Sequence, residues 1–92
     1  MPTWEKFRRS ILAGQSDHNI GFNDLCKYVA ALGFTERTVG SHHVFVKHGV
    51  VEIINLQPDE NNRSKAKAYQ VRQIRNLILK YGLAQDERRG EN

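Results

Sequence analysis

Apolar residues recur every three or four positions in three stretches of the chain, which is the spacing of an amphipathic helix. The first stretch follows Thr3, a residue type that caps helices well, and ends at Gly14. The others cover about residues 22–32 and 69–81, and each ends just before a glycine. The apolar positions of the three stretches are Trp4, Phe7, Ile11 and Leu12; Leu25, Val29 and Leu32; and Val71, Ile74, Leu77 and Ile78.

Three predicted strands lie between the second and third helices. They cover about residues 34–39, 42–47 and 50–56. Two-residue turns at Gly40–Ser41 and His48–Gly49 join them, so neighbouring strands run antiparallel. Polar residues 15–21 predict a linker, and residues 56–68 predict a loop before the last helix. The element order α-α-β-β-β-α predicts an α+β fold, with helices on one face of a three-stranded antiparallel sheet.

The hairpin between the second and third strands assigns its side chains to two faces. With His48–Gly49 as the turn, Lys47 pairs with Val50 and, further along, His43 pairs with Ile54. One face then carries Val44, Val46, Val51 and Ile53, and we expect it to be the core face. The exposed face is expected to carry His43, Phe45, Lys47, Glu52 and Ile54. His43 is thus predicted to point outward, and His42 toward the core at the end of the strand.

Positive charge is concentrated in the last third of the chain. The 92 residues suit one small domain, and 14 Lys and Arg against 10 Asp and Glu give a net charge of +4. No carboxylate lies between Glu60 and Asp86. The cations of that stretch are Arg63, Lys65, Lys67, Arg72, Arg75 and Lys80. A basic stretch without acids is typical of a surface that binds a polyanion, most often nucleic acid.

Several protein classes are excluded by composition. No apolar run approaches the roughly 20 residues of a membrane span, and the mixed charges near the N-terminus do not resemble a signal peptide. Cys26 is the single cysteine, which excludes an internal disulfide framework, and we expect it to be a small buried residue on a helix. These features predict a cytoplasmic protein with no membrane partner.

Two adjacent histidines follow the turn Gly40–Ser41. Histidine can both accept and donate a proton near neutral pH, and a proton-transfer group near cations is what phosphodiester cleavage requires. On the predicted faces, His43 is the candidate for proton transfer and His42 is a packing residue. Lys47 lies on the same predicted face as His43 and could stabilise developing negative charge. Gly40 and Ser41 support the pair by shaping the turn.

Other chemistry is less well supported. Ser41 is not predicted to be a nucleophile, because no Asp or Glu accompanies His43 in a triad-like order. The four histidines do not predict a zinc site, since adjacent histidines point apart on a strand and the chain has no cysteine pair. We therefore expect no metal and no cofactor. A second proton-transfer group is not evident from the sequence.

A longer pattern spans about residues 22–83. It consists of Phe22-x-x-Leu25, Leu32-Gly33-Phe34, Gly40-Ser41-His42-His43-Val44-Phe45, a loop rich in cations, and Val71-Arg72-x-Ile74 to Leu79-x-x-Gly82-Leu83. This pattern resembles the HicA family, the toxins of HicA–HicB toxin–antitoxin modules. The resemblance implies a fold like that of double-stranded-RNA-binding domains (dsRBD-like, α-β-β-β-α) for residues 22–83. Residues 1–21 are then an added helix and linker, and residues 84–92 a flexible charged tail.

The resemblance also implies a function. HicA toxins belong to type II toxin–antitoxin systems and are ribosome-independent endoribonucleases that cleave mRNA, and the HicB antitoxin inhibits them by covering the active site. For this chain we expect metal-independent cleavage. The family's catalytic histidine follows Gly-Ser-x, which is His43 in this sequence. Under this hypothesis the residues that contact RNA are Arg63, Lys65, Lys67, Arg72 and Arg75. This chain differs ahead of the last helix, where Tyr69 and Gln70 replace the usual Gly or Thr after a longer loop.

Two alternatives remain. One is an RNA-binding module of the same fold without catalysis. The segment Gly40–His43 favours the enzyme, because a protein that binds A-form RNA relies on phosphate and 2′-hydroxyl contacts and needs no histidine there. The other is a protein-interaction domain that uses an apolar outer patch of Phe45, Val50 and Ile54. Under the toxin hypothesis, a HicB-like antitoxin would bind this same patch.

Overall fold

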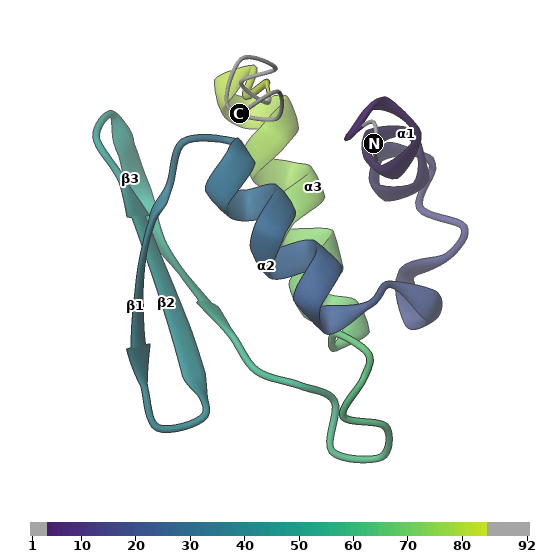
Figure 1. The fold of residues 1–92 in the computed structure, drawn as a ribbon. Helices are drawn as coiled ribbons and strands as arrows, with labels where there is room; N and C mark the ends of the chain where they lie inside the picture. Colours follow the sequence, from purple (N-terminus) through teal and green to yellow (C-terminus); the bar gives the residue numbers. More distant parts are fainter. Residues whose placement is uncertain (1–3, 85–92) are drawn as a thin grey trace.

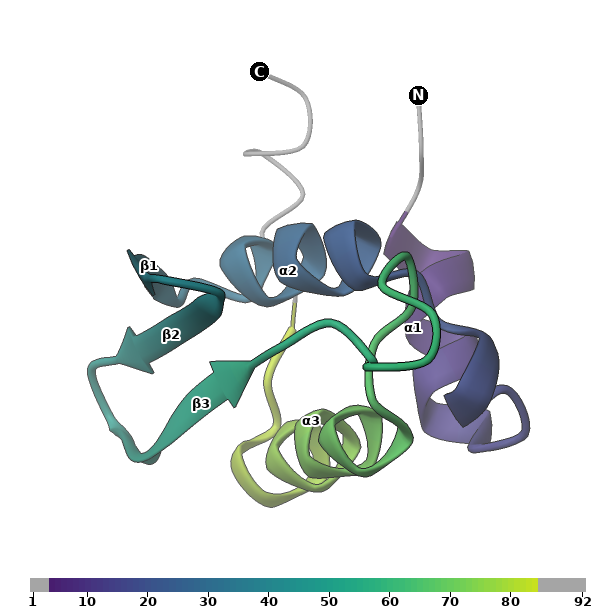
Figure 2. The same cartoon turned by 90° about the horizontal axis from the view of Figure 1, so that it is seen from below.

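The structure, a computed structural model, describes residues 4–84 of the chain. The sheet lies on one side of the molecule, helix α1 on the other, and helices α2 and α3 between them (Figures 1 and 2). The elements are α1 (Trp4–Ala13), the short 3₁₀ helix η1 (Asp17–Asn19), α2 (Phe22–Ala31), β1 (Thr35–Val39), β2 (His42–Lys47), β3 (Val50–Leu56) and α3 (Ala68–Tyr81).

The predicted α+β fold is confirmed. The three strands form an antiparallel sheet in the order β1-β2-β3, with the two predicted turns between them. Helix α3 ends where predicted, because Gly82 adopts φ +63°, a left-handed conformation that glycine tolerates and other residues disfavour. The predicted cap Thr3 and nearly all of the predicted tail lie outside the described residues.

The prediction of which sheet face is buried is wrong. Phe45 and Ile54 are 0% and 1% exposed, whereas Val51 and Ile53 are 88% and 61% exposed. Both faces are apolar, and the helix layer covers the one with the larger side chains, which fill more of the space between sheet and helices. The predicted docking patch therefore does not exist, because Phe45 and Ile54 belong to the core and Val50 packs against it.

The strand register also differs from the prediction. The β2–β3 hairpin starts as predicted with Lys47 opposite Val50, but His43 pairs with Leu56 rather than Ile54. An irregularity between Phe45 and Lys47, of the β-bulge type, shifts the register by two residues. Because the shift is an even number of residues, each face carries the residues predicted to share it. The buried face, however, is the one predicted to be exposed.

Helix α1 packs on the same core as the rest of the described chain. Ile11 is fully buried, and the rings of Trp4 and Phe7 lie 5.3 and 5.2 Å from the ring of Tyr28 in α2. Arg8 Nη1 donates a hydrogen bond of 2.8 Å to the carbonyl oxygen of Leu83, after α3. No helix in residues 4–84 combines the length and the apolar character that a membrane crossing requires.

Candidate functional site

The two histidines are the first residues of β2 and directly follow the Gly40–Ser41 turn. Gly40 adopts φ +60°, and no heavy atom lies within 4 Å of the position that a Cβ would take there. The backbone conformation, rather than a lack of space, is what favours glycine at this position. The turn places both histidines at the end of the sheet where α2 begins (Figure 1).

His43 lies on the face of the sheet that α2 covers. Its ring packs edge-on against the ring of Phe22, the first residue of α2, with the ring centroids 5.1 Å apart. The side chain of His43 is 28% exposed. The predicted outward orientation is therefore wrong, for the same reason that the buried face was misassigned. His43 is instead at the margin of the core, with part of its ring open to solvent.

A carboxylate that the sequence interpretation missed holds one nitrogen of His43. Glu36 Oε2 lies 2.5 Å from His43 Nδ1. In the β1–β2 register, Glu36 is opposite Phe45 and Thr38 is opposite His43, which makes Glu36 a diagonal neighbour of His43 on the same face. Because the carboxylate accepts the hydrogen bond, the neutral form of the imidazole carries its proton on Nδ1 and keeps a lone pair on Nε2. Within residues 4–84, Nε2 of His43 has no hydrogen-bond partner.

The carboxylate of Glu36 is also close enough to affect the cysteine in α2. Burial, reinforced by the negative charge of Glu36, raises the pKa of the Cys26 thiol to about 12. Cys26 therefore remains a protonated, buried thiol rather than a nucleophile. This agrees with the packing role expected from the sequence. Glu36 lies on the sheet face that the helices cover, because it is opposite the buried Phe45.

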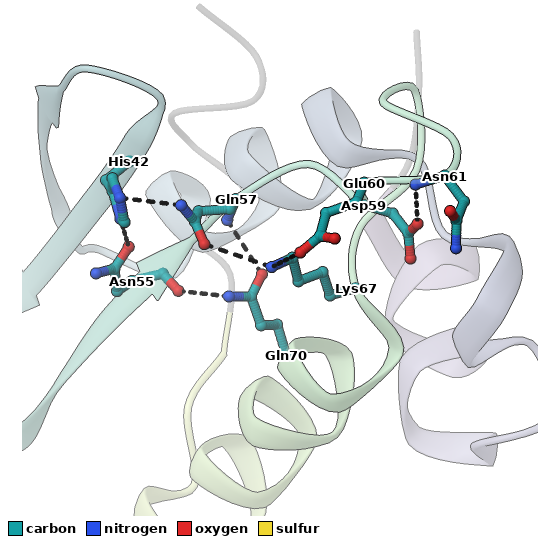
Figure 3. Close-up of polar contacts among 8 residues, drawn as sticks. All are labelled: His42, Asn55, Gln57, Asp59, Glu60, Asn61, Lys67 and Gln70. Atoms are coloured by element: carbon teal, nitrogen blue, oxygen red, sulfur yellow. Dashed lines mark hydrogen bonds and ion pairs between the residues drawn. The ribbon is translucent and has the colours of Figure 1, made fainter.

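His42 has a different set of partners, shown in Figure 3. Its Nδ1 lies 3.1 Å from Asn55 Oδ1, and its Nε2 lies 2.9 Å from Gln57 Nε2. Lys67 Nζ donates to Gln57 Oε1 at 3.4 Å, which directs the amide NH₂ of Gln57 toward His42. A neutral ring with its proton on Nδ1 satisfies both contacts. The prediction that His42 points into the core is wrong: it shares the open face with Asn55 and binds polar side chains.

Gln70, in the first turn of α3, anchors the end of β3. Its Nε2 donates to the carbonyl oxygen of Asn55 at 2.9 Å, and its Oε1 accepts from the backbone N–H of Gln57 at 3.1 Å. Gln70 is buried, so its amide replaces water as the partner of these backbone groups. One of the two residues that depart from the HicA pattern thus has a structural role next to His42.

Residues 57–67, here called the basic loop, run from the end of β3 to the start of α3 and pass the start of α2 (Figure 2). The backbone N–H of Phe22 donates to the carbonyl oxygen of Ser64, and that of Ala66 donates to Ile20, each at 2.9 Å. Phe22 is also the residue whose ring contacts His43. The segment that carries Arg63 and Lys65 is therefore joined to the residue that touches His43.

Three of the predicted RNA-contacting cations are available to a ligand. Arg63 and Arg72 are exposed and Lys65 is partly exposed. In the described part of the chain, none of these three side chains makes a hydrogen bond or an ion pair with another residue. Arg72 also lines a polar depression of about 380 Å³ between the basic loop and the start of α3, together with Asp59, Glu60, Tyr69 and others.

Arg75 has a structural role. Its Nη1 and Nη2 lie 3.0 and 3.2 Å from the two carboxylate oxygens of Asp17, and Nη1 also donates to Ile11 O at 3.0 Å. The side chains of Arg75 and Asp17 are only 17% and 10% exposed. This bidentate pair joins α3 to η1 and α1, so we do not include Arg75 among the groups that can bind a phosphate.

Two other cations of the basic stretch also have acidic partners. Lys67 Nζ lies 3.8 Å from Glu60, and Lys80 Nζ lies 2.7 Å from Glu52. A hydrogen bond from Lys80, and to a smaller extent one from Tyr81, lowers the pKa of Glu52 to about 2. Although this stretch of the sequence contains no carboxylate, the fold brings carboxylates from other segments next to three of its cations. The positive charge available to bind a polyanion is therefore smaller than predicted.

Lys47 does not lie with His43. Its Nζ is 2.8 Å from the position that a Cβ on Gly33 would take, just after the end of α2, whereas His43 contacts the start of α2. Four residues of a strand span about 13 Å. The two side chains share a face, as predicted, but occupy opposite ends of it.

Comparison of the chain with models of protein families, with curated protein sequences and with solved structures found no match. Among residues 4–84, His, Cys, Asp and Glu side chains do not gather in groups of three or more that could hold a metal ion. His43 at the start of β2 and the basic loop, joined through Phe22, form the candidate functional site.

Proposed function

We propose that this chain is an endoribonuclease whose proton-transfer residue is His43. One observation carries the proposal. An imidazole has its Nδ1 held by a carboxylate and no partner on Nε2 in the described residues. Its ring contacts Phe22, whose backbone N–H is bonded to Ser64, the residue between the cations Arg63 and Lys65. Proton transfer and phosphate binding are the two requirements of RNA cleavage without a metal.

The reaction uses the 2′-hydroxyl of RNA as nucleophile. His43 Nε2 accepts the proton of that hydroxyl as the 2′-oxygen bonds to the adjacent phosphorus. The bond from phosphorus to the 5′-oxygen breaks, and the departing oxygen takes a proton from water. The hydroxide that remains takes the proton held by His43, which restores the neutral imidazole. The products are a 2′,3′-cyclic phosphate and a 5′-hydroxyl. Arg63 and Lys65 lower the barrier by stabilising the negative charge of the pentacovalent phosphorane.

The resemblance to HicA toxins supports a finer proposal. The substrate is mRNA in the cytoplasm, and a HicB-like antitoxin neutralises the enzyme. The Gly40–Phe45 pattern and the α-β-β-β-α order of residues 22–83 support it. An apolar surface open to a protein partner is the exposed sheet face with Val39, Val46, Val51 and Ile53.

Cleavage of RNA by the full chain in the presence of EDTA tests the proposal. We expect end-labelled single-stranded RNA to give fragments that end in a 2′,3′-cyclic phosphate. The same RNA with 2′-O-methyl groups should stay intact, because it has no nucleophile. Binding of both RNAs with cleavage of neither would contradict the enzyme and favour the RNA-binding module.

Replacing Arg63 and Lys65 together with alanine should weaken RNA binding for every sequence alike. Each lost phosphate contact should reduce the slope of log K against log[salt] by roughly 0.7 on single-stranded RNA, so the double variant should lose about 1.4. Fluorescence anisotropy over a salt series measures this slope. Lys6→Ala with Arg9→Ala is the matched control, since it removes two exposed cations from α1. Equal losses in both double variants would mean that only net charge matters.

A further inference from the structure

The contact between Glu36 and His43 has a geometry that fixes the orientation of the imidazole. The carboxylate approaches Nδ1 from β1, and the ring of Phe22 packs against the imidazole from α2. Rotating the imidazole by half a turn would place a carbon at Oε2 and lose the hydrogen bond. With side-chain exposures of 35% for Glu36 and 28% for His43, water competes only partly for this contact.

The position of the ring proton decides what the imidazole can do. A neutral imidazole carries one proton, and the nitrogen that carries it can donate but cannot accept. Without a partner on Nδ1, the proton is free to move to Nε2, and the solvent-facing nitrogen then loses its capacity to accept. A carboxylate at Nδ1 keeps the proton there, because protonated Nδ1 donates to it and unprotonated Nδ1 would repel it.

The other groups around the pair do not compete for this role. From α2, the neighbours are Phe22 and Cys26, whose thiol stays protonated. The strand residues opposite His43 are Thr38 on β1 and Leu56 on β3. Within residues 4–84, Glu36 is the only acidic side chain that bonds to His43.

We infer that Glu36 is a positioning residue, which holds His43 with its proton on Nδ1 and presents Nε2 as the proton acceptor. The Nδ1–H tautomer of His43 is inferred from the geometry of the Glu36 contact alone. Its importance for cleavage rests on the proposed function. Glu36 and His43 are seven positions apart in the chain, on either side of the Gly40–Ser41 turn, and the antiparallel register of β1 and β2 brings them together.

The tautomer can be measured without substrate. Long-range ¹H–¹⁵N spectra of the full chain at about pH 8.5, where imidazoles are neutral, distinguish a proton on Nδ1 from one on Nε2. We expect Nδ1–H for His43 in the unmodified protein and in Glu36→Gln, whose amide oxygen can still accept. In Glu36→Met, which keeps the length of the side chain without an acceptor, we expect the Nε2–H form to become populated. Glu52→Gln, which removes a carboxylate bound to Lys80, is the matched control.

Cleavage kinetics complete the test. We expect kcat to fall about 10- to 100-fold in Glu36→Met, the scale seen when an orienting partner of a metal-bound histidine is lost, with little change in KM. Glu36→Gln should recover part of that loss. His43 with its proton on Nε2 in the unmodified chain, or an unchanged tautomer in Glu36→Met, would overturn the inference even if the chain cleaves RNA. A shifted tautomer in a chain that never cleaves RNA would support the positioning role and contradict the proposed function.

Discussion

Replacing His43 with alanine should reduce RNA cleavage by about 10²–10⁴-fold, the usual scale for loss of a general acid or base. RNA affinity should change little, because Arg63 and Lys65 remain to bind the phosphates. Single-turnover cleavage and anisotropy on the same preparation separate the two effects. His48→Ala removes an exposed histidine from the β2–β3 turn and is the matched control, with cleavage expected to stay unchanged.

The His43→Ala variant should also be less stable than the unmodified protein. The ring contacts Phe22 and bonds to Glu36, so its loss should lower the free energy of unfolding by about 1–2 kcal/mol. Activity should therefore be compared well below the melting temperature of the variant. A folded His43→Ala protein that cleaves RNA at the normal rate would contradict the catalytic assignment. Loss of cleavage in His42→Ala but not in His43→Ala would assign the proton-transfer role to His42, which contacts Lys67 through Gln57.

Replacing Arg75 with alanine should lower the free energy of unfolding by about 3 kcal/mol. Removing one partner of a largely buried ion pair leaves the other charge without compensation, which typically costs about 3–5 kcal/mol. Here the remaining charge is Asp17, which is only 10% exposed. Because small domains have a total stability of about 5–15 kcal/mol, urea unfolding should detect the change easily.

Arg72, in the preceding turn of the same helix, provides the matched control for Arg75. It is exposed and makes no ion pair within the described residues, so Arg72→Ala should change stability by less than about 0.5 kcal/mol. If either arginine contacts RNA, Arg72 should be the one whose loss weakens binding. Normal stability together with weaker RNA binding in Arg75→Ala would restore Arg75 to the RNA-binding set predicted from the sequence.

The order and approximate extent of the three α-helices and three strands could be predicted because the relevant signals are local, whereas the short helix η1 lies in the predicted linker. Helical spacing of apolar residues and glycines such as Gly82 mark where helices run and stop. The buried face of the sheet could not be predicted, because Val51 and Ile53 on one side are as apolar as Phe45 and Ile54 on the other. Only the helices that cover the sheet distinguish the two faces, and their placement is a tertiary property.

The candidate site was predictable only in part for a related reason. His43 follows a turn that the sequence marks clearly, whereas its partner Glu36 depends on the pairing of two strands. Arg75 looked like a free cation because Asp17 lies 58 residues earlier in the chain. Residue types were therefore predictable from the sequence, but the pairs they form across the fold were not.

Adjacent residues of a strand face opposite sides, so β2 separates its two histidines: His43 lies under α2 and His42 lies on the open side. A molecule seated on the exposed valines of the open face reaches His42 first and leaves the Glu36–His43 contact untouched. The two sides meet along the border of the sheet, and the Gly40–Ser41 turn is the part of that border that directly precedes both histidines. An inhibitor that binds the open face therefore has to extend past the border of the sheet to reach His43, and how far it reaches matters more than how much of the open face it covers.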